Sequence, residues 1–135
     1  MLITPLEKLS WREFERLCFH YFKARGYKPR ETSEGADGGV DLIIYNFRDK
    51  ADEAIQIKHY INSGNQITVK EIRELNSAKR NHSCPLAMFI TTTGYTKEAL
   101  KEADKFKINC RGENWVVDRI VKWQEKEAKK LGLVG

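Results

Sequence analysis

Three polar side chains lie in or beside apolar runs of the sequence, where they could converge on a phosphate or a metal ion. Asp41 interrupts the run Val40-Asp-Leu-Ile-Ile-Tyr45. Gln56 and Lys58 alternate with isoleucines in the run Ala54-Ile-Gln-Ile-Lys-His-Tyr60, so they point to the same face of a strand. If the two runs pair, a carboxylate, an amide oxygen and an ammonium group meet in front of a hairpin.

These groups suit the hydrolysis of a phosphodiester bond. Hard oxygen atoms bind Mg²⁺, with Mn²⁺ as an alternative, and a nearby ammonium group offsets negative charge on the phosphate. A carboxylate in an apolar run is costly unless it lies at an edge, is paired or binds a metal. Two other interpretations stay open, namely that Asp41 forms a salt bridge with Lys58, and that Gln56 and Lys58 line a solvated strand face.

The elements that must position these side chains can be read from local patterns. Ser10-Trp-Arg-Glu13 is a capping box, which predicts a helix over about 11–25 that ends at Gly26. The two apolar runs predict an antiparallel pair of strands, separated by a polar turn at 46–52. A Gly- and Ser-rich loop at 31–39 precedes them. Gly38 and Gly39 there allow either a close approach of the backbone to phosphate or metal, or a simple turn.

The rest of the chain alternates between helical and strand-like patterns. Helical spacing of apolar residues predicts helices over 69–79 and 114–131, and Thr96 is placed to cap another helix. The run Leu86–Thr91 predicts a buried strand, and a short strand is expected at 108–110. This order predicts an α/β fold, with a mixed central sheet flanked by helices.

Composition limits the class of protein. A chain of 135 residues with 41% hydrophobic content predicts a single domain over 1–135. The net charge of +5 favours a polyanionic partner, although it is also ordinary for a soluble surface. Cys18, Cys84 and Cys110 lack metal-ligand spacing and predict reduced thiols in a cytoplasmic protein. Since the sequence lacks an apolar run of about 20 residues, we expect neither a membrane span nor secretion.

The segment Gly35-Ala-Asp-Gly-Gly-Val-Asp-Leu-Ile-Ile44, followed by Ile55-Gln-Ile-Lys-His-Tyr60, resembles the catalytic core of the Mrr-like restriction endonucleases, a branch of the PD-(D/E)xK nuclease superfamily. Further blocks at 9–15, 69–75 and 91–96 resemble the family's leading helix, the helix after the active-site strands and a threonine-rich strand end. The resemblance covers about residues 9–110, which leaves the C-terminal helix outside it.

The resemblance implies a restriction-endonuclease-like fold and a Mg²⁺-dependent endonuclease that cuts DNA. Asp41 corresponds to the metal-binding acid, Gln56 stands where Asp or Glu is usual, and Lys58 corresponds to the catalytic lysine. The main-chain carbonyl of Ile57 would complete the metal ligands, and Glu15 matches the acid on the leading helix. A neutral amide at position 56 is expected to weaken metal affinity.

Basic residues outside this set could neutralise DNA phosphates, although charged helix faces are usually just solvated. The candidates are Lys70, Arg73, Lys28 and Arg30. Family members with a restriction role typically carry a separate recognition domain, so we expect a homodimer or a separate recognition subunit here. The alternative function is a DNA-binding or assembly module derived from a nuclease that has lost turnover. An RNA-processing nuclease is weaker, because aromatic platforms for single-stranded RNA are not evident.

Overall fold

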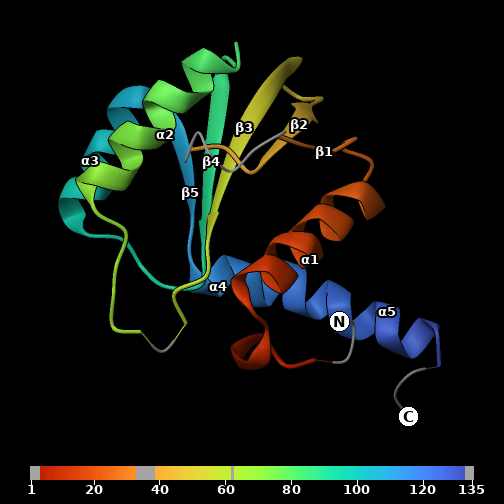
Figure 1. Ribbon diagram of the computed structural model, residues 1–135. Helices are drawn as coiled ribbons and strands as arrows, with labels where there is room; N and C mark the ends of the chain where they lie inside the picture. Colours follow the sequence, from red (N-terminus) through yellow and green to blue (C-terminus); the bar gives the residue numbers. More distant parts are fainter. Residues whose placement is uncertain (1–3, 33–38, 62, 133–135) are drawn as a thin grey trace.

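A five-stranded mixed sheet forms the centre of the structure, a computed structural model that describes residues 4–32, 39–61 and 63–132 (Figure 1). The strands follow the order β1-β2-β3-β4-β5. Strand β2 is antiparallel to both β1 and β3, whereas β4 is parallel to β3 and β5 is parallel to β4. The mixed sheet predicted from the sequence is therefore confirmed. The strands are β1 (Arg30–Glu31), β2 (Leu42–Asn46), β3 (Ala51–Lys58), β4 (Leu86–Thr91) and β5 (Ile108–Arg111).

The predicted hairpin is formed by β2 and β3, with Leu42 opposite Ile55. Asp41 lies directly before β2 rather than inside it, so the expected strand 40–45 begins two residues late. Its main-chain N–H nevertheless donates to the carbonyl of Ile55 at 2.8 Å, which holds it beside β3. Asp41 and Gln56 are thereby placed next to each other by backbone pairing alone.

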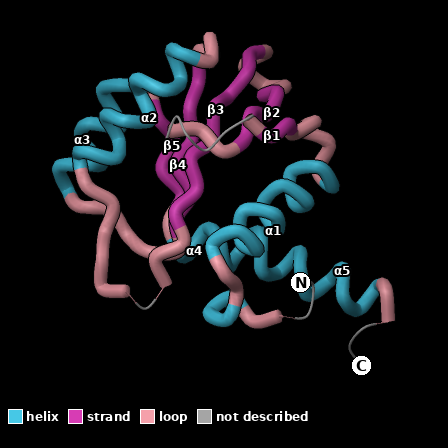
Figure 2. Tube along the Cα trace, in the orientation of Figure 1, coloured by secondary structure: helices cyan, strands magenta, loops and turns pink. Residues whose placement is uncertain are grey.

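One face of the sheet is covered by α1 (Trp11–Ala24) and by the C-terminal helices (Figures 1 and 2). The predicted capping box is present, because Ser10 Oγ accepts from the Glu13 N–H at 3.1 Å and Glu13 Oε1 accepts from the Ser10 N–H at 2.8 Å. Gly26, with φ of +84°, follows the helix as predicted. The expected helix over 114–131 is α4 (Glu113–Trp115), a π-helical segment (Val116–Val121) and α5 (Lys122–Lys130).

The other face is covered by α2 (Val69–Asn81) and α3 (Lys97–Phe106) (Figure 1). Both helices are close to their predicted bounds, and Thr96 Oγ1 caps α3 by accepting from the Ala99 N–H at 3.0 Å. Their apolar side chains bury Phe89 of β4 completely. Two separate apolar clusters therefore sandwich the sheet, as an α/β fold requires.

Gly39 packs against α2, where the structure leaves no room for a side chain. It is buried, and a Cβ atom at this position would overlap the Cβ of Ala78 on α2. The close approach of the chain to α2 thus gives Gly39 a packing role that the sequence did not predict. Asp37 and Gly38 lie outside the described residues.

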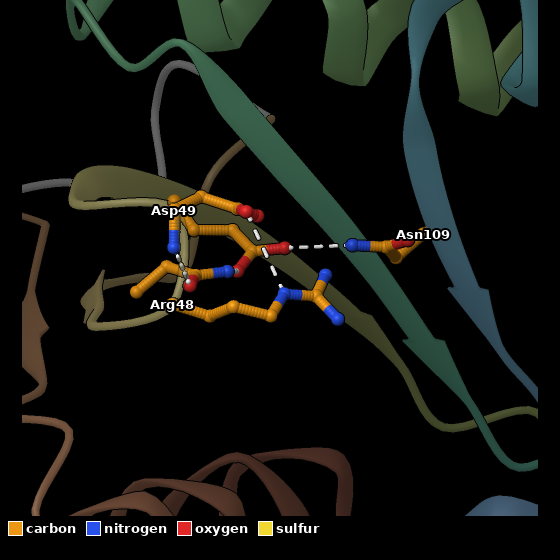
Figure 3. Close-up of polar contacts among 5 residues, drawn as sticks. Arg48, Asp49 and Asn109 are labelled. Atoms are coloured by element: carbon orange, nitrogen blue, oxygen red, sulfur yellow. Dashed lines mark hydrogen bonds and ion pairs between the residues drawn. The ribbon is translucent and has the colours of Figure 1, made fainter.

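Strand β3 begins three residues earlier than expected and includes the buried carboxyl group of Glu53. Glu53, 1% exposed, accepts from Asn46 Nδ2 and from Asn109 Nδ2, each at 3.1 Å. Figure 3 shows Asn109 reaching this cluster from β5, with the exposed pair Arg48 and Asp49 on the nearby turn. The strand expected at 54–60 therefore begins at Ala51 and ends at Lys58.

Smaller differences from the sequence analysis concern the short elements. Glu31 was expected in a loop but pairs with Leu42 in β1. A 3₁₀ turn, Leu6–Lys8, precedes α1. Cys18 and Cys84 are buried and Cys110 is half-buried, and all three are free thiols as predicted. Within the described ranges, every helix is too short or too polar to cross a membrane.

Candidate active site

The four predicted catalytic side chains line one cavity of about 360 Å³ at the open end of the β2–β3 hairpin, opposite its turn. Asp41 comes from the residue before β2, Gln56 and Lys58 from β3, and Glu15 from the middle of α1. The main chain of Ile57 lies between the two β3 side chains. The other lining residues are Trp11, Gly39, Val40, His59 and Tyr60.

Hydrogen bonds from β3 hold the Asp41 carboxylate. Its Oδ2 atom accepts from the Ile57 N–H at 2.7 Å and from Gln56 Nε2 at 3.0 Å. These donors explain how an acid is tolerated beside a buried strand. Among the described ion pairs none joins Asp41 to Lys58 within 4.0 Å, so the salt-bridge interpretation is not supported. Lys58 is still close enough for its charge to lower the pKa of Asp41.

Gln56 is only 8% exposed, which rules out the interpretation that it lines a solvated face. Its Nε2 atom lies 3.0 Å from Asp41 Oδ2 and 3.4 Å from the Ile57 carbonyl oxygen. One amide nitrogen therefore bridges the two oxygen atoms that the family resemblance assigns to a metal. The amide oxygen was predicted at this place, so the Gln56 side chain must rotate about its last bond to become a metal ligand.

The carboxyl groups of Glu15 and Asp41 are close enough for each to change the pKa of the other. Burial, followed by the negative charge of Asp41, raises the pKa of Glu15 from 4.5 to about 7. Burial also raises the pKa of Asp41, while the hydrogen bond from Ile57 and the charge of Lys58 lower it. The hydrogen bond between the two carboxyl groups raises the pKa of Glu15 and lowers that of Asp41, so a shared proton resides on Glu15. A cation placed between the two groups would relieve their repulsion.

The donor atoms at this site fit a hard divalent cation. In the parts of the chain that the structure describes, no group of three or more His, Cys, Asp or Glu side chains could hold a metal. Beside the carboxyl groups of Glu15 and Asp41, the cavity offers two neutral oxygen atoms, those of the Gln56 amide and the Ile57 carbonyl. An all-oxygen set with two carboxylates suits Mg²⁺ or Mn²⁺ rather than Zn²⁺.

His59 lines the cavity but has a structural role. Its Nε2 lies 2.9 Å from the Leu9 carbonyl oxygen, its Nδ1 lies 3.0 Å from Thr92 Oγ1, and its ring stacks on Phe14. Because a carbonyl can only accept, Nε2 carries the proton and Nδ1 accepts from the threonine. Burial lowers the pKa of His59, so the ring is neutral and joins the start of α1 to the end of β3.

The four basic residues predicted to contact DNA lie in different surroundings. Lys70 is exposed and lines a second cavity, which shares Lys58 and Tyr60 with the first. Arg73 Nε donates to Glu102 Oε2 at 2.6 Å, and Arg30 pairs with Asp52 at 3.3 Å. Lys28 is exposed just before β1.

Trp11 was not singled out as a site residue from the sequence, yet it lines the same cavity as the predicted catalytic residues. Its position four residues before Glu15 could have revealed it, because residues i and i+4 share a helix face.

Comparisons with known proteins agree with this fold. The family model Mrr_cat, described as a restriction endonuclease, matches residues 6–117. None of the curated proteins matches the chain. The crystal structure of a protein of unknown function, AF1548, is similar with a TM-score of 0.65 and 14% identity, over 86% of this chain and 65% of that one.

A second similar structure is the MspJI restriction endonuclease in complex with a 27-mer oligonucleotide. It matches with a TM-score of 0.57 and 17% identity, over 89% of this chain and 30% of that one. The chain thus spans less than two thirds of either structure's length. At these identities the two structures show a common fold alone.

Proposed function

Since this chain belongs to the restriction endonuclease family whose model matches residues 6–117, we propose that it is a Mg²⁺-dependent endonuclease that hydrolyses phosphodiester bonds of DNA. One observation carries the proposal: the Glu15, Asp41, Gln56 and Lys58 side chains line a single cavity. The raised pKa of Glu15 beside Asp41 supports it, because crowded carboxyl groups in a cavity are typical of catalytic sites.

The proposed metal ligands are the carboxylates of Asp41 and Glu15, the carbonyl of Ile57 and the rotated amide of Gln56. When bound, Mg²⁺ neutralises phosphate charge and makes a bound water more acidic. Asp41 is held ready for this role by the Ile57 N–H, which fixes the carboxylate without a counter-ion. Gln56 contributes no charge, so we expect weaker metal affinity than a third carboxylate would give.

Lys58 lines both this cavity and the neighbouring cavity that reaches α2. Its ammonium group can orient the attacking water and offset the negative charge that develops on the phosphate oxygens. Glu15, with a pKa of about 7 in the metal-free protein, would give up its proton when a cation binds beside it and would then hold that cation. These are the roles that we propose for the two side chains.

DNA is the proposed partner, and Lys70 is the predicted contact closest to the catalytic cavity, at the neighbouring one. Specificity is proposed to come from a homodimer or from a separate recognition subunit. The loss of one anionic ligand at Gln56 favours, as a second candidate, a module that binds DNA without cutting it.

The test is incubation of the purified protein with supercoiled, linear, methylated and junction DNA, in Mg²⁺ or Mn²⁺. We expect nicking or cutting that EDTA abolishes. Asp41→Ala and Lys58→Ala should each lower the rate by orders of magnitude while circular dichroism shows an intact fold. Asp104→Ala and Lys101→Ala, on the exposed side of α3, are the charge-matched controls and should cut normally. Normal DNA binding with every substrate left intact would instead favour the non-cutting module.

A further inference from the structure

Trp11 is an exposed aromatic side chain at the mouth of the catalytic cavity. It is the first residue of α1, it is 54% exposed, and it lines the same cavity as Glu15 and Asp41. The bond between His59 and the Leu9 carbonyl fixes the start of α1 beside the end of β3 (Figure 1). A large apolar ring is therefore held in solvent next to the proposed chemistry, where the fold itself does not use it.

A cation covers part of this ring. The Arg12 guanidinium lies 4.7 Å from the centroid of Trp11. This stacking restricts the tryptophan and adds positive charge beside its exposed surface. An aromatic ring next to a guanidinium group is the combination that proteins use to hold a base and its neighbouring phosphate.

The cleft continues from Trp11 past the proposed catalytic residues. The catalytic cavity and the second cavity share Lys58 and Tyr60, and the second one extends to Lys70 on α2. Asn65 and Gln66 add neutral polar groups to its wall, and Glu71 and Glu74 of α2 add carboxylates. A single polynucleotide strand following this cleft would pass the Arg12 guanidinium beside Trp11, then Lys58 and then Lys70, and its phosphates would have to face these cations and avoid Glu71 and Glu74. Its bases would meet the Trp11 ring at one end.

A paired base inside an intact duplex has no free face for such a ring, because its neighbours already stack on both sides of it. A base can stack on Trp11 only if it is single-stranded, bulged or turned out of the duplex.

From these observations we infer that Trp11 is a stacking platform for an unpaired base next to the bond to be cut, and that the preferred substrate is DNA with an unpaired nucleotide at that place. This inference rests on the proposed nuclease function and narrows its substrate. Arg12 would position the ring and contact a flanking phosphate.

The experiment measures binding without cleavage, by fluorescence anisotropy in EDTA at a fixed salt concentration. The probes share one sequence and are a paired duplex, the same duplex with a one-nucleotide bulge, single-stranded DNA and single-stranded RNA. We expect the wild type to prefer bulged over paired DNA. Trp11→Ala should lose at least about fivefold in affinity for the bulged probe and with it the preference, whereas Trp11→Phe should keep most of both.

Phe47→Ala is the matched control, because Phe47 is an equally exposed aromatic residue, 50% exposed, on the turn between β2 and β3. It should bind all probes like the wild type. A 2-aminopurine placed in the bulge should be quenched by the wild type and not by Trp11→Ala. Equal weakening of bulged and paired DNA, or no weakening, would overturn the inference. Preference for the RNA probe would overturn the assignment to DNA.

Cleavage of the same DNA probes in Mg²⁺ separates this inference from the proposed function. If bulged DNA binds through Trp11 but is never cut, the stacking platform stands and the endonuclease proposal fails. If duplex DNA is cut as fast as bulged DNA, and Trp11→Ala changes neither rate, the endonuclease proposal stands and the platform fails.

Discussion

Replacement of Glu15 by glutamine should stabilise the metal-free protein at pH 8 but not at pH 4.5. The pKa of Glu15 is about 7 in the folded protein against an ordinary 4.5, so the folded state binds more protons than the unfolded state between these values. The protonated Glu15 therefore contributes stability that is fully present below pH 4.5 and is lost as the pH rises through 7. Glutamine stays neutral, and its amide can still donate to Asp41.

The magnitude follows from the same pKa values. At about 1.36 kcal/mol for each pH unit, a rise from 4.5 to about 7 corresponds to at most about 3.4 kcal/mol. Because Glu15 is partly exposed, solvent screening reduces the expected gain to about 1–2 kcal/mol at pH 8. This gain should disappear nearly completely at pH 4.5.

Urea unfolding in EDTA at the two pH values measures both free energies. Glu125→Gln on the exposed side of α5 is the matched control, and it should change stability by less than about 0.5 kcal/mol at either pH. A Glu15→Gln variant with the same stability difference from the wild type at pH 4.5 and pH 8 would refute the reasoning. It would mean that Glu15 is an ordinary solvated acid that does not feel Asp41.

Three further changes test other parts of the structure. Gly39→Ala should destabilise the protein by about 1–3 kcal/mol in urea unfolding, because the new methyl group would overlap α2; Gly94→Ala, where a Cβ makes ordinary contacts, should be nearly neutral, and equal effects would contradict the packing role. Arg73→Ala should lower Tm by breaking an ion pair, whereas Lys70→Ala should leave Tm unchanged and reduce the salt dependence of DNA binding by about one counter-ion. If instead Lys70→Ala lowered Tm and Arg73→Ala reduced the salt dependence of DNA binding, Arg73 would be the DNA contact and Lys70 the structural residue. Gln56→Glu should bind Mg²⁺ more tightly by calorimetry and keep cleaving, yet lower the stability of the metal-free protein, since it replaces a donor to a carboxylate by another carboxylate. Unchanged metal affinity would place this side chain outside the metal site.

The sequence predicted the elements whose causes are local. The Ser10 capping box, the Thr96 cap and the uninterrupted apolar run of β4 each depend on a few neighbouring residues, and all are confirmed. The pairing of β2 with β3 was also predictable, because alternation on both sides of a polar turn favours a hairpin.

Features that depend on distant residues were not predictable. β1 has two residues and no pattern of its own, since its pairing is set by the neighbouring β2. The packing of Gly39 needs a helix that follows thirty residues later in the chain. The family resemblance predicted that the four proposed catalytic side chains lie together. It did not predict the orientation of the Gln56 amide, because that depends on the position of Asp41 Oδ2.

The carboxylate of Glu53 has a consequence for how the sheet assembles. Its two partners belong to the end of β2 and to β5, so a correct fold of three strands is needed to satisfy it. A strand shifted by one residue would turn Glu53 to the opposite face and leave a charge among apolar side chains. A misaligned sheet would therefore be destabilised by the cost of burying this unpaired charge. That cost would not arise if position 53 carried an apolar side chain. The hydrogen bonds of the buried Glu53 carboxylate therefore favour the native strand alignment over a shifted one.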